Sequence, residues 1–163
     1  MLQMKQLIVG ILCACSFTVP SGASQSYKKA VSDCRVELKN DTLTIENNRI
    51  RRRWIWNKGH LITCRLEDKK NALAWRVANR QPDLVLPKEA KDAGEASIRA
   101  EEVKASMPYT HHLRATVEYR LGQLWVRRIF KVYPDCPAIA CELYLKGKAS
   151  RKWVKTFDNP ADL

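Results

Sequence analysis

Apolar and polar residues alternate with a period of two along most of the chain from Cys34 onward. This alternation is typical of β-strands that have one buried side and one solvent-facing side. Turn-forming residues separate the alternating runs at Asn40-Asp41, Asn47-Asn48, Asn57-Lys58-Gly59, Asp68–Asn71, Leu121-Gly122-Gln123 and Lys146-Gly147. Many short strands with turns at regular spacing predict an all-β chain that folds as an antiparallel β-sandwich.

Two segments depart from the alternation. Residues 79–94 combine prolines with mixed charge and predict a long excursion, with at most a short strand at Leu84–Leu86. Such a loop is either a disordered insertion or a segment that touches a ligand or a neighbouring domain. Residues 95–107 predict a strand with a bulge, although their Ala, Glu and Lys content also favours a helix.

The first 23 residues have the three parts of a secretory signal peptide. Lys5 precedes an apolar run from Leu7 to Val19, and the small residues of Pro20-Ser21-Gly22-Ala23 follow it. The run is shorter than the roughly 20 residues of a transmembrane helix. The alternatives are a buried N-terminal helix, or a lipid anchor at Cys15 on a loose match. We therefore expect a secreted or periplasmic protein without a membrane span.

The same pattern divides the chain into four parts. Residues 1–23 are the predicted signal peptide, 24–32 a polar linker and 33–148 the β-sandwich domain. Residues 149–163 are polar and predict a tail or the start of a connection to another domain.

The formal net charge of +12 suggests an acidic partner, such as anionic lipid or a sulfated or uronic-acid polymer. The basic residues are spread along the chain, which also fits solvent-facing strand positions. Because a secreted protein seldom meets nucleic acid as its ligand, we expect no nucleic-acid partner.

Six cysteines are present, of which Cys13 and Cys15 would leave with the signal peptide. The four that remain allow three disulfide pairings in an oxidising compartment. Cys136 could pair with Cys141 across a bend, which would leave Cys34 with Cys64. The alternative is four buried free thiols. The sequence has no Cys-x-x-Cys spacing, so it predicts no zinc site, and nothing in it implies a cofactor.

Catalytic motifs are missing from the sequence: it has no phosphate-binding glycine loop, no Gly-x-Ser-x-Gly and no His-Glu-x-x-His. His60 follows Gly59 in a turn and is expected to be exposed, whereas His111 and His112 should face opposite sides of a strand. Glycoside hydrolysis needs two carboxyl groups across a sugar ring. No pair stands out among the available acids, Asp68, Glu118, Asp135 and Glu142. We expect no active site within this chain.

Aromatic residues give a better indication of function. Exposed tryptophans can stack on sugar rings while a neighbouring amide or guanidinium group supplies hydrogen bonds. The candidates for carbohydrate binding are Trp54, Trp56, Asn57, Trp75 and Trp125. The alternative is that these rings fill the interior of the sandwich. Trp54 and Trp56 share a face of one strand, which favours the core or a domain contact for these two.

Two stretches carry a family resemblance. One runs Asp41-Thr-Leu-Thr-Ile-Glu-Asn-Asn-Arg-Ile50, then Arg53-Trp-Ile-Trp-Asn-Lys-Gly59 and Leu61-Ile-Thr63. The other runs Trp125-Val-Arg-Arg-Ile-Phe-Lys-Val-Tyr-Pro134, then Cys136-Pro-Ala-Ile139. The sequence from Cys34 to Gly147 resembles the N-terminal β-sandwich of α-galactosidase-like glycoside hydrolases, family 36 and its melibiase relatives.

The resemblance implies a galactose mutarotase-like sandwich that precedes a (β/α)8 barrel. In such enzymes the two catalytic aspartates lie on the barrel, and the sandwich packs against it. No segment of this sequence matches the barrel, so no catalytic residue is carried over and the sandwich itself could be incomplete. The resemblance predicts an accessory domain that is inactive alone, with carbohydrate or the barrel as its partner. The alternatives are a free-standing carbohydrate-binding module and a basic secreted protein that binds anionic glycans.

Overall fold

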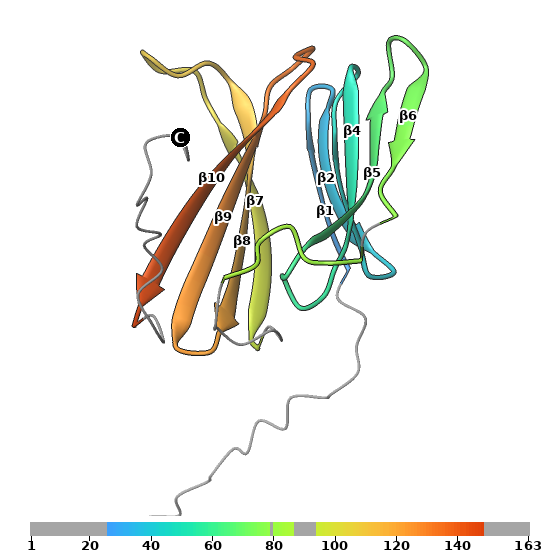
Figure 1. Ribbon diagram of the computed structural model, residues 1–163. Helices are drawn as coiled ribbons and strands as arrows, with labels where there is room; N and C mark the ends of the chain where they lie inside the picture. Colours follow the sequence, from blue (N-terminus) through green and yellow to red (C-terminus); the bar gives the residue numbers. More distant parts are fainter. Residues whose placement is uncertain (1–25, 79, 87–93, 149–163) are drawn as a thin grey trace, which may run out of the picture.

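A computed structural model describes residues 26–78, 80–86 and 94–148, which form ten β-strands in two antiparallel sheets (Figure 1). The first sheet consists, in spatial order, of β1 (Tyr27–Val31), β2 (Cys34–Lys39), β3 (Thr42–Glu46), β4 (Ile50–Ile55), β5 (Ile62–Asp68) and β6 (Leu73–Arg76). The second has the order β10 (Ile139–Gly147), β9 (Leu124–Val132), β8 (His112–Leu121) and β7 (Ala96–Val103). No helix occurs in this part of the chain. The prediction of an antiparallel β-sandwich is confirmed.

One lateral edge of the sandwich is closed by β1 and β7. The hydroxyl group of Tyr27 donates to the carbonyl oxygen of Ala100 at 3.0 Å and accepts from the amide of the same residue at 2.7 Å. Beside this edge, β2 lies against β8. The prediction of a linker over residues 24–32 is therefore wrong in part, because Tyr27–Val31 forms a strand paired with β2. Its exposed lysines are typical of a strand at a sheet edge.

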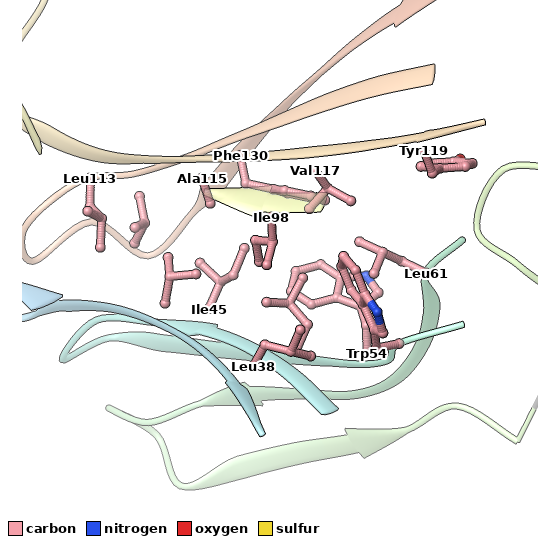
Figure 2. Close-up of a cluster of buried hydrophobic side chains, with 14 of the residues drawn as sticks. Leu38, Ile45, Trp54, Leu61, Ile98, Leu113, Ala115, Val117, Tyr119 and Phe130 are labelled. Carbon is pink, nitrogen blue, oxygen red and sulfur yellow. The ribbon is translucent and has the colours of Figure 1, made fainter. Parts of the chain in front are cut away.

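The core lies between the two sheets, where the inward side chains of both interdigitate (Figure 2). Trp54 is its largest fully buried side chain, and its ring centroid lies 5.1 Å from that of Phe130 on the opposite sheet. The other inward residues are mainly aliphatic: Val36, Leu38, Leu43, Ile45, Leu61, Ile98, Leu113, Val117, Val126 and Val132. This is the alternation that the sequence predicts.

Asn47 joins the two sheets at one end of the core. Its side chain is fully buried, and its Nδ2 donates to the carbonyl oxygens of Tyr133 and Cys136, both at 2.7 Å. Its Oδ1 accepts from the amides of Arg49 and Ile50 at 2.8 and 2.9 Å. All four bonding positions of the amide are therefore used. They fix the β3–β4 turn against the corner between β9 and β10.

A β-bulge interrupts the β4–β5 hairpin. Arg53 pairs with Arg65, but the next residue, Trp54, pairs with Thr63, so Cys64 is left without a direct partner. An extra residue of this kind lets both Trp54 and Thr63 face the interior while Arg53 and Arg65 face solvent.

One local prediction needs correction, and two open questions are resolved. His60 is buried, not exposed, because the turn at Gly59 (φ +82°) folds inward and stacks the imidazole ring on Tyr119 at 5.5 Å. Leu84–Leu86 is not a strand; Leu84 and Leu86 pack on the core from an irregular segment. Residues 96–103 form β7, so the strand is confirmed over the helix, but its register against β8 is unbroken and the expected bulge is absent.

The predicted signal peptide and the predicted tail, 1–23 and 149–163, lie outside the described residues. Within the described ranges, no helix is long and apolar enough to span a bilayer.

Candidate functional site

On the side of the sandwich away from β1 and β7, core-facing side chains of β6 and β10 are left uncovered. Arg52 pairs with Ile45 on one side and with Leu66 on the other, and Leu66 pairs with Trp75. Because directly paired residues share a face, Leu66 and Trp75 face the same way as the buried Ile45. Trp75 is nevertheless 50% exposed, and Leu73 on the same strand is equally open.

The opposing strand has the same property. Cys141, Leu143 and Leu145 of β10 pair with inward-facing residues of β9, yet all three are exposed, Leu143 by 47%. We call the uncovered set Leu73, Trp75, Cys141, Leu143 and Leu145 the open seam. The two sheets meet closely at β1 and β7 and leave the inner faces of β6 and β10 without a cover.

A polar cluster lies inside the open seam, centred on the half-buried carboxylate of Asp83. Its Oδ2 accepts from Trp54 Nε1 at 2.9 Å, from Thr63 Oγ1 at 2.7 Å and from Arg52 Nη2 at 3.2 Å. Its Oδ1 accepts from the amide of Thr63 at 2.8 Å. Burial alone would raise the pKa of Asp83, but the hydrogen bonds from Thr63 and Trp54 and the charge of Arg128 bring that pKa below its ordinary value.

Arg128 enters the same cluster from the second sheet. Its side chain is nine-tenths buried, its Nη2 lies 3.7 Å from Asp83 Oδ2, and its guanidinium carbon is 5.1 Å from the ring centroid of Phe130. Its Nη1 is buried without a hydrogen-bond partner among the described residues. Arg52 and Arg128 therefore share one carboxylate, and burial lowers the pKa of Arg52. The cluster retains one excess positive charge facing the open seam.

An aromatic groove of about 600 Å³ lies on the outer face of the second sheet. Trp125 and Tyr144, both exposed, line it with Glu118, Arg127 and Lys146. Arg127 Nε donates to Glu118 Oε1 at 2.6 Å, which fixes two polar groups beside the rings. An exposed indole beside fixed donors and acceptors is chemically suited to a sugar, which offers an apolar ring face and hydroxyl groups.

The predicted sugar-binding residues fall into three places. Trp54 and Trp56 are buried in the core, so their rings are not available for stacking and the prediction for these two is corrected. Asn57 is exposed in its turn, Trp75 lies in the open seam and Trp125 lies in the groove. The structure therefore does not gather these residues into one site. Tyr144 was missed, although its alternation with Leu143 and Leu145 in β10 already placed it on the outer face.

All four described cysteines are free thiols. Neither the Cys136–Cys141 pair nor the Cys34–Cys64 pair is present. Cys34 alone is fully buried, where desolvation and the adjacent carboxylate of Asp33 raise its pKa to about 12. The Sγ of Cys64 lies 3.3 Å from the carbonyl oxygen of Arg53, at the bulge.

The candidate acids each contact a local partner. Asp68 accepts from Asn71 in its turn, Asp135 pairs with Arg49 at 3.4 Å, and Glu142 pairs with Lys131. Glu118 is held by Arg127. Over the ranges that the structure describes, no group of three or more His, Cys, Asp or Glu side chains could hold a metal ion.

His111 and His112 take opposite faces of the chain, as predicted. His111 is half-buried and its Nε2 lies 2.9 Å from Glu102 Oε1, whereas His112 is buried with its ring 4.9 Å from that of Tyr133.

Comparison with protein-family models, with curated proteins and with solved structures finds no match. A proposal for the function therefore has to rest on the open seam, the aromatic groove and the sequence resemblance.

Proposed function

We propose that this chain is a non-catalytic accessory β-sandwich of a secreted α-galactosidase-like glycoside hydrolase, and that its open seam packs against the catalytic (β/α)8 barrel. The supporting observation is the exposure of core-facing side chains along β6 and β10. The inner faces of a self-contained sandwich cover each other. Contiguous exposed apolar residues on such faces mark a protein contact.

The composition of the open seam favours a protein domain over a small ligand. Trp75, Leu73 and Leu143 supply large apolar surfaces. The guanidinium group of Arg128 is buried, and its Nη1 has no hydrogen-bond partner among the described residues. Aromatic and arginine side chains with a desolvated surround are typical of the centre of protein interfaces. An acidic side chain of the barrel, directed at Arg128, would neutralise the excess charge of the polar cluster.

The isolated chain is expected to self-associate through the open seam. Replacing Trp75 and Leu143 together by serine should shift sedimentation velocity profiles toward the monomer and lower the fluorescence of a bound apolar dye by more than half. The matched control is Ile55→Ser, because Ile55 is similarly exposed, at 42%, but lies on the outer face of the first sheet. Equal behaviour of the two variants would show that the open seam has no special affinity for protein.

Two further tests address the enzyme itself. The gene beyond the codon of Leu163 is expected to encode, in frame or after a frameshift, a barrel with two catalytic aspartates. The purified chain is expected to release no nitrophenol from a nitrophenyl α-galactoside. A different fold encoded there would contradict the accessory role, and measurable release would contradict the non-catalytic role.

The aromatic groove favours a second candidate function, a carbohydrate-binding module. Trp125→Ala is then expected to weaken binding of a neutral oligosaccharide about tenfold, or about 1.4 kcal/mol, in isothermal titration calorimetry. The same change should alter the free energy of unfolding by no more than about 0.5 kcal/mol, because the ring is on the surface. Trp75→Ala is the matched control. Absence of binding to every neutral oligosaccharide tried would exclude this candidate.

A further inference from the structure

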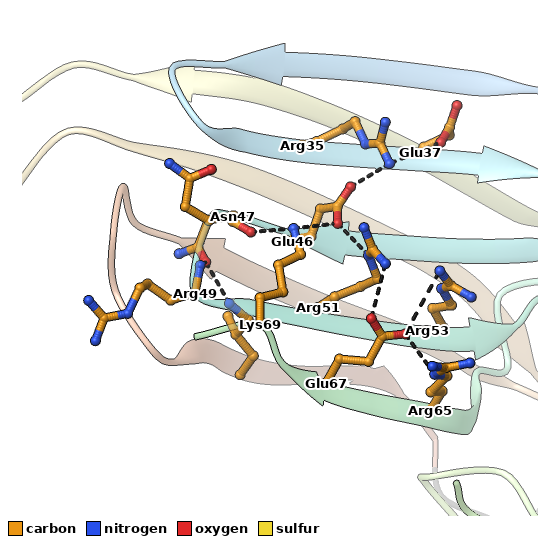
Figure 3. A network of polar contacts seen from close by, with 12 residues as sticks. Arg35, Glu37, Glu46, Asn47, Arg49, Arg51, Arg53, Arg65, Glu67 and Lys69 are labelled. Carbon is orange, nitrogen blue, oxygen red and sulfur yellow. Dashed lines mark hydrogen bonds and ion pairs between the residues drawn. The ribbon is translucent and has the colours of Figure 1, made fainter. Parts of the chain in front are cut away.

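The outer face of the first sheet carries charged side chains in two adjacent rows that differ in pattern. One row alternates in sign across the strands: Arg35 pairs with Glu46, Glu46 with Arg51, and Arg51 with Glu67. Figure 3 shows the resulting contacts, in which Glu46 binds Arg35, Arg51 and Lys69. Opposite charges that directly oppose one another stabilise a sheet. This row neutralises itself.

The neighbouring row has a different arrangement. Arg53 of β4 pairs with Arg65 of β5, and Arg65 pairs with Arg76 of β6. We call these three residues the arginine row. Like charges placed directly opposite each other destabilise a sheet. The row therefore costs the fold stability, although the row beside it shows that this sheet can carry alternating charges.

The counter-charge available to the arginine row is small. Glu67 lies 2.7 Å from Arg65 and 3.8 Å from Arg53, and it also pairs with Arg51 at 3.0 Å. One carboxylate thus serves three guanidinium groups. Arg76, at the exposed edge strand, has no ion-pair partner among the described residues. Because Glu67 also neutralises Arg51 in the alternating row, the arginine row keeps at least two positive charges that the sheet does not neutralise.

The geometry of the row suits a ligand with repeated acidic groups. Neighbouring strands are about 4.8 Å apart, so three adjacent strands present three guanidinium groups over about 10 Å. Each group is planar and can donate two parallel hydrogen bonds to a carboxylate or sulfate. We propose that the arginine row binds the carboxylate or sulfate groups of an acidic polysaccharide.

A polysaccharide fits the row better than a nucleic acid does. Proteins that bind single strands combine basic residues with aromatic side chains on which bases stack. The arginine row and its cross-strand neighbours Thr44 and Glu37 include no aromatic residue, and Trp75 of β6 faces the opposite side of the sheet. The row is therefore equipped to recognise acidic groups and not bases. This site is independent of the accessory role proposed above, because it lies on the outer face of the sheet.

The test uses the whole chain and two probes, heparin for sulfate groups and a polyuronate for carboxylate groups. Replacing Arg53, Arg65 and Arg76 together by glutamine is expected to weaken binding of at least one probe about 10- to 100-fold in titrations at low salt. The variant should elute from immobilised heparin at a lower salt concentration. Its urea midpoint is expected to stay unchanged or rise, because repulsion between the three arginines is removed.

The control is a triple glutamine variant with the same change in net charge, at Arg99, Arg114 and Lys131, whose side chains lie on the outer face of the second sheet and pair with Glu118, Glu101 and Glu142. The proposal expects this variant to bind the probes within about threefold of the wild-type chain. Equal weakening of both variants would show that total charge alone determines binding. Equal affinity for single-stranded DNA, with equal sensitivity to the arginine-row substitutions, would overturn the choice of ligand. Failure of both probes to bind the wild-type chain would overturn the site itself, while leaving the self-association test of the open seam unaffected.

Discussion

Replacing Trp54 by alanine is expected to lower the free energy of unfolding by about 3 to 5 kcal/mol. The side chain is fully buried and packs on Phe130 across the two sheets, and its Nε1 donates to Asp83. Truncation would remove the largest buried side chain in the core and leave a cavity that the rigid sheets cannot collapse. Since small domains are stable by only about 5 to 15 kcal/mol, this loss equals most of the stability of a domain at the lower end of that range.

Urea unfolding followed by tryptophan fluorescence and circular dichroism measures this effect. Trp54→Phe separates its two parts, because it keeps an aromatic ring against Phe130 and removes only the Nε1 donor and part of the volume. We expect it to cost less than half as much as alanine. Trp125→Ala serves as the surface control. An equal cost for Trp54→Ala and Trp125→Ala would mean that Trp54 does not hold the sheets together.

The second large effect is expected at Asp83. Removing the carboxylate with alanine leaves the buried Arg128 and the partly exposed Arg52 without a counter-charge, and leaves Trp54 Nε1 and Thr63 without their acceptor. Breaking a fully buried pair costs about 3 to 5 kcal/mol, mostly because an uncompensated charge stays buried. Because Asp83 is only half-buried, we expect a cost at the lower end of this range. Asp83→Asn keeps the shape and one acceptor oxygen, so its cost should fall between that of alanine and zero.

The contribution of Asp83 should also depend on pH. Its pKa is below the ordinary value in the folded chain, so folding is favoured by the ionised form. The stabilisation is fully present above the unfolded pKa of about 3.9 and is lost as the pH falls through the lower folded value. The charged groups that face Asp83 are the guanidinium groups of Arg52 and Arg128.

The measurement is the difference in free energy of unfolding between wild type and Asp83→Asn, followed from pH 6 downward. Asp33, Glu46 and Asp68 also have lowered pKa values, so both proteins should lose stability in acid. The difference between them isolates Asp83 and should shrink below about pH 4. A difference that stays constant down to about pH 2 would contradict an ionised Asp83 in the folded chain.

The strands of the core could be predicted from the sequence because each has its own alternation of apolar and polar residues. Leu43 and Ile45, for example, alternate with threonines and lie fully buried. Strand β1 could not be found in this way: an exposed edge strand buries little, and Lys28 and Lys29 give it the composition of a linker. The position of His60 was missed because a turn is usually on the surface, whereas this one folds against Tyr119.

The open seam and the aromatic groove were harder to predict from the sequence than the core. The polar cluster joins Arg52, Thr63, Asp83 and Arg128, which are separated by tens of residues and meet only when an irregular segment crosses the open seam. No local pattern marks such a meeting. The sequence indicates Trp75 and Trp125 as aromatic candidates. It does not indicate which surface each ring occupies, because this depends on how far the inner faces of the two sheets cover each other.

The unpaired residue in the β4–β5 hairpin has a consequence for how this sequence can vary. On the turn side of Cys64, Trp54 pairs with Thr63, and on the other side Arg53 pairs with Arg65. The pairing register therefore shifts by one residue at Cys64. Side-chain direction alternates strictly along a strand, so loss of one codon at this point would exchange interior and exterior for one half of the hairpin. The number of residues in β5 around Cys64 thus keeps Arg65 in contact with solvent and Leu66 on the side of the core. Substitutions in this part of β5 should be tolerated more readily than insertions or deletions.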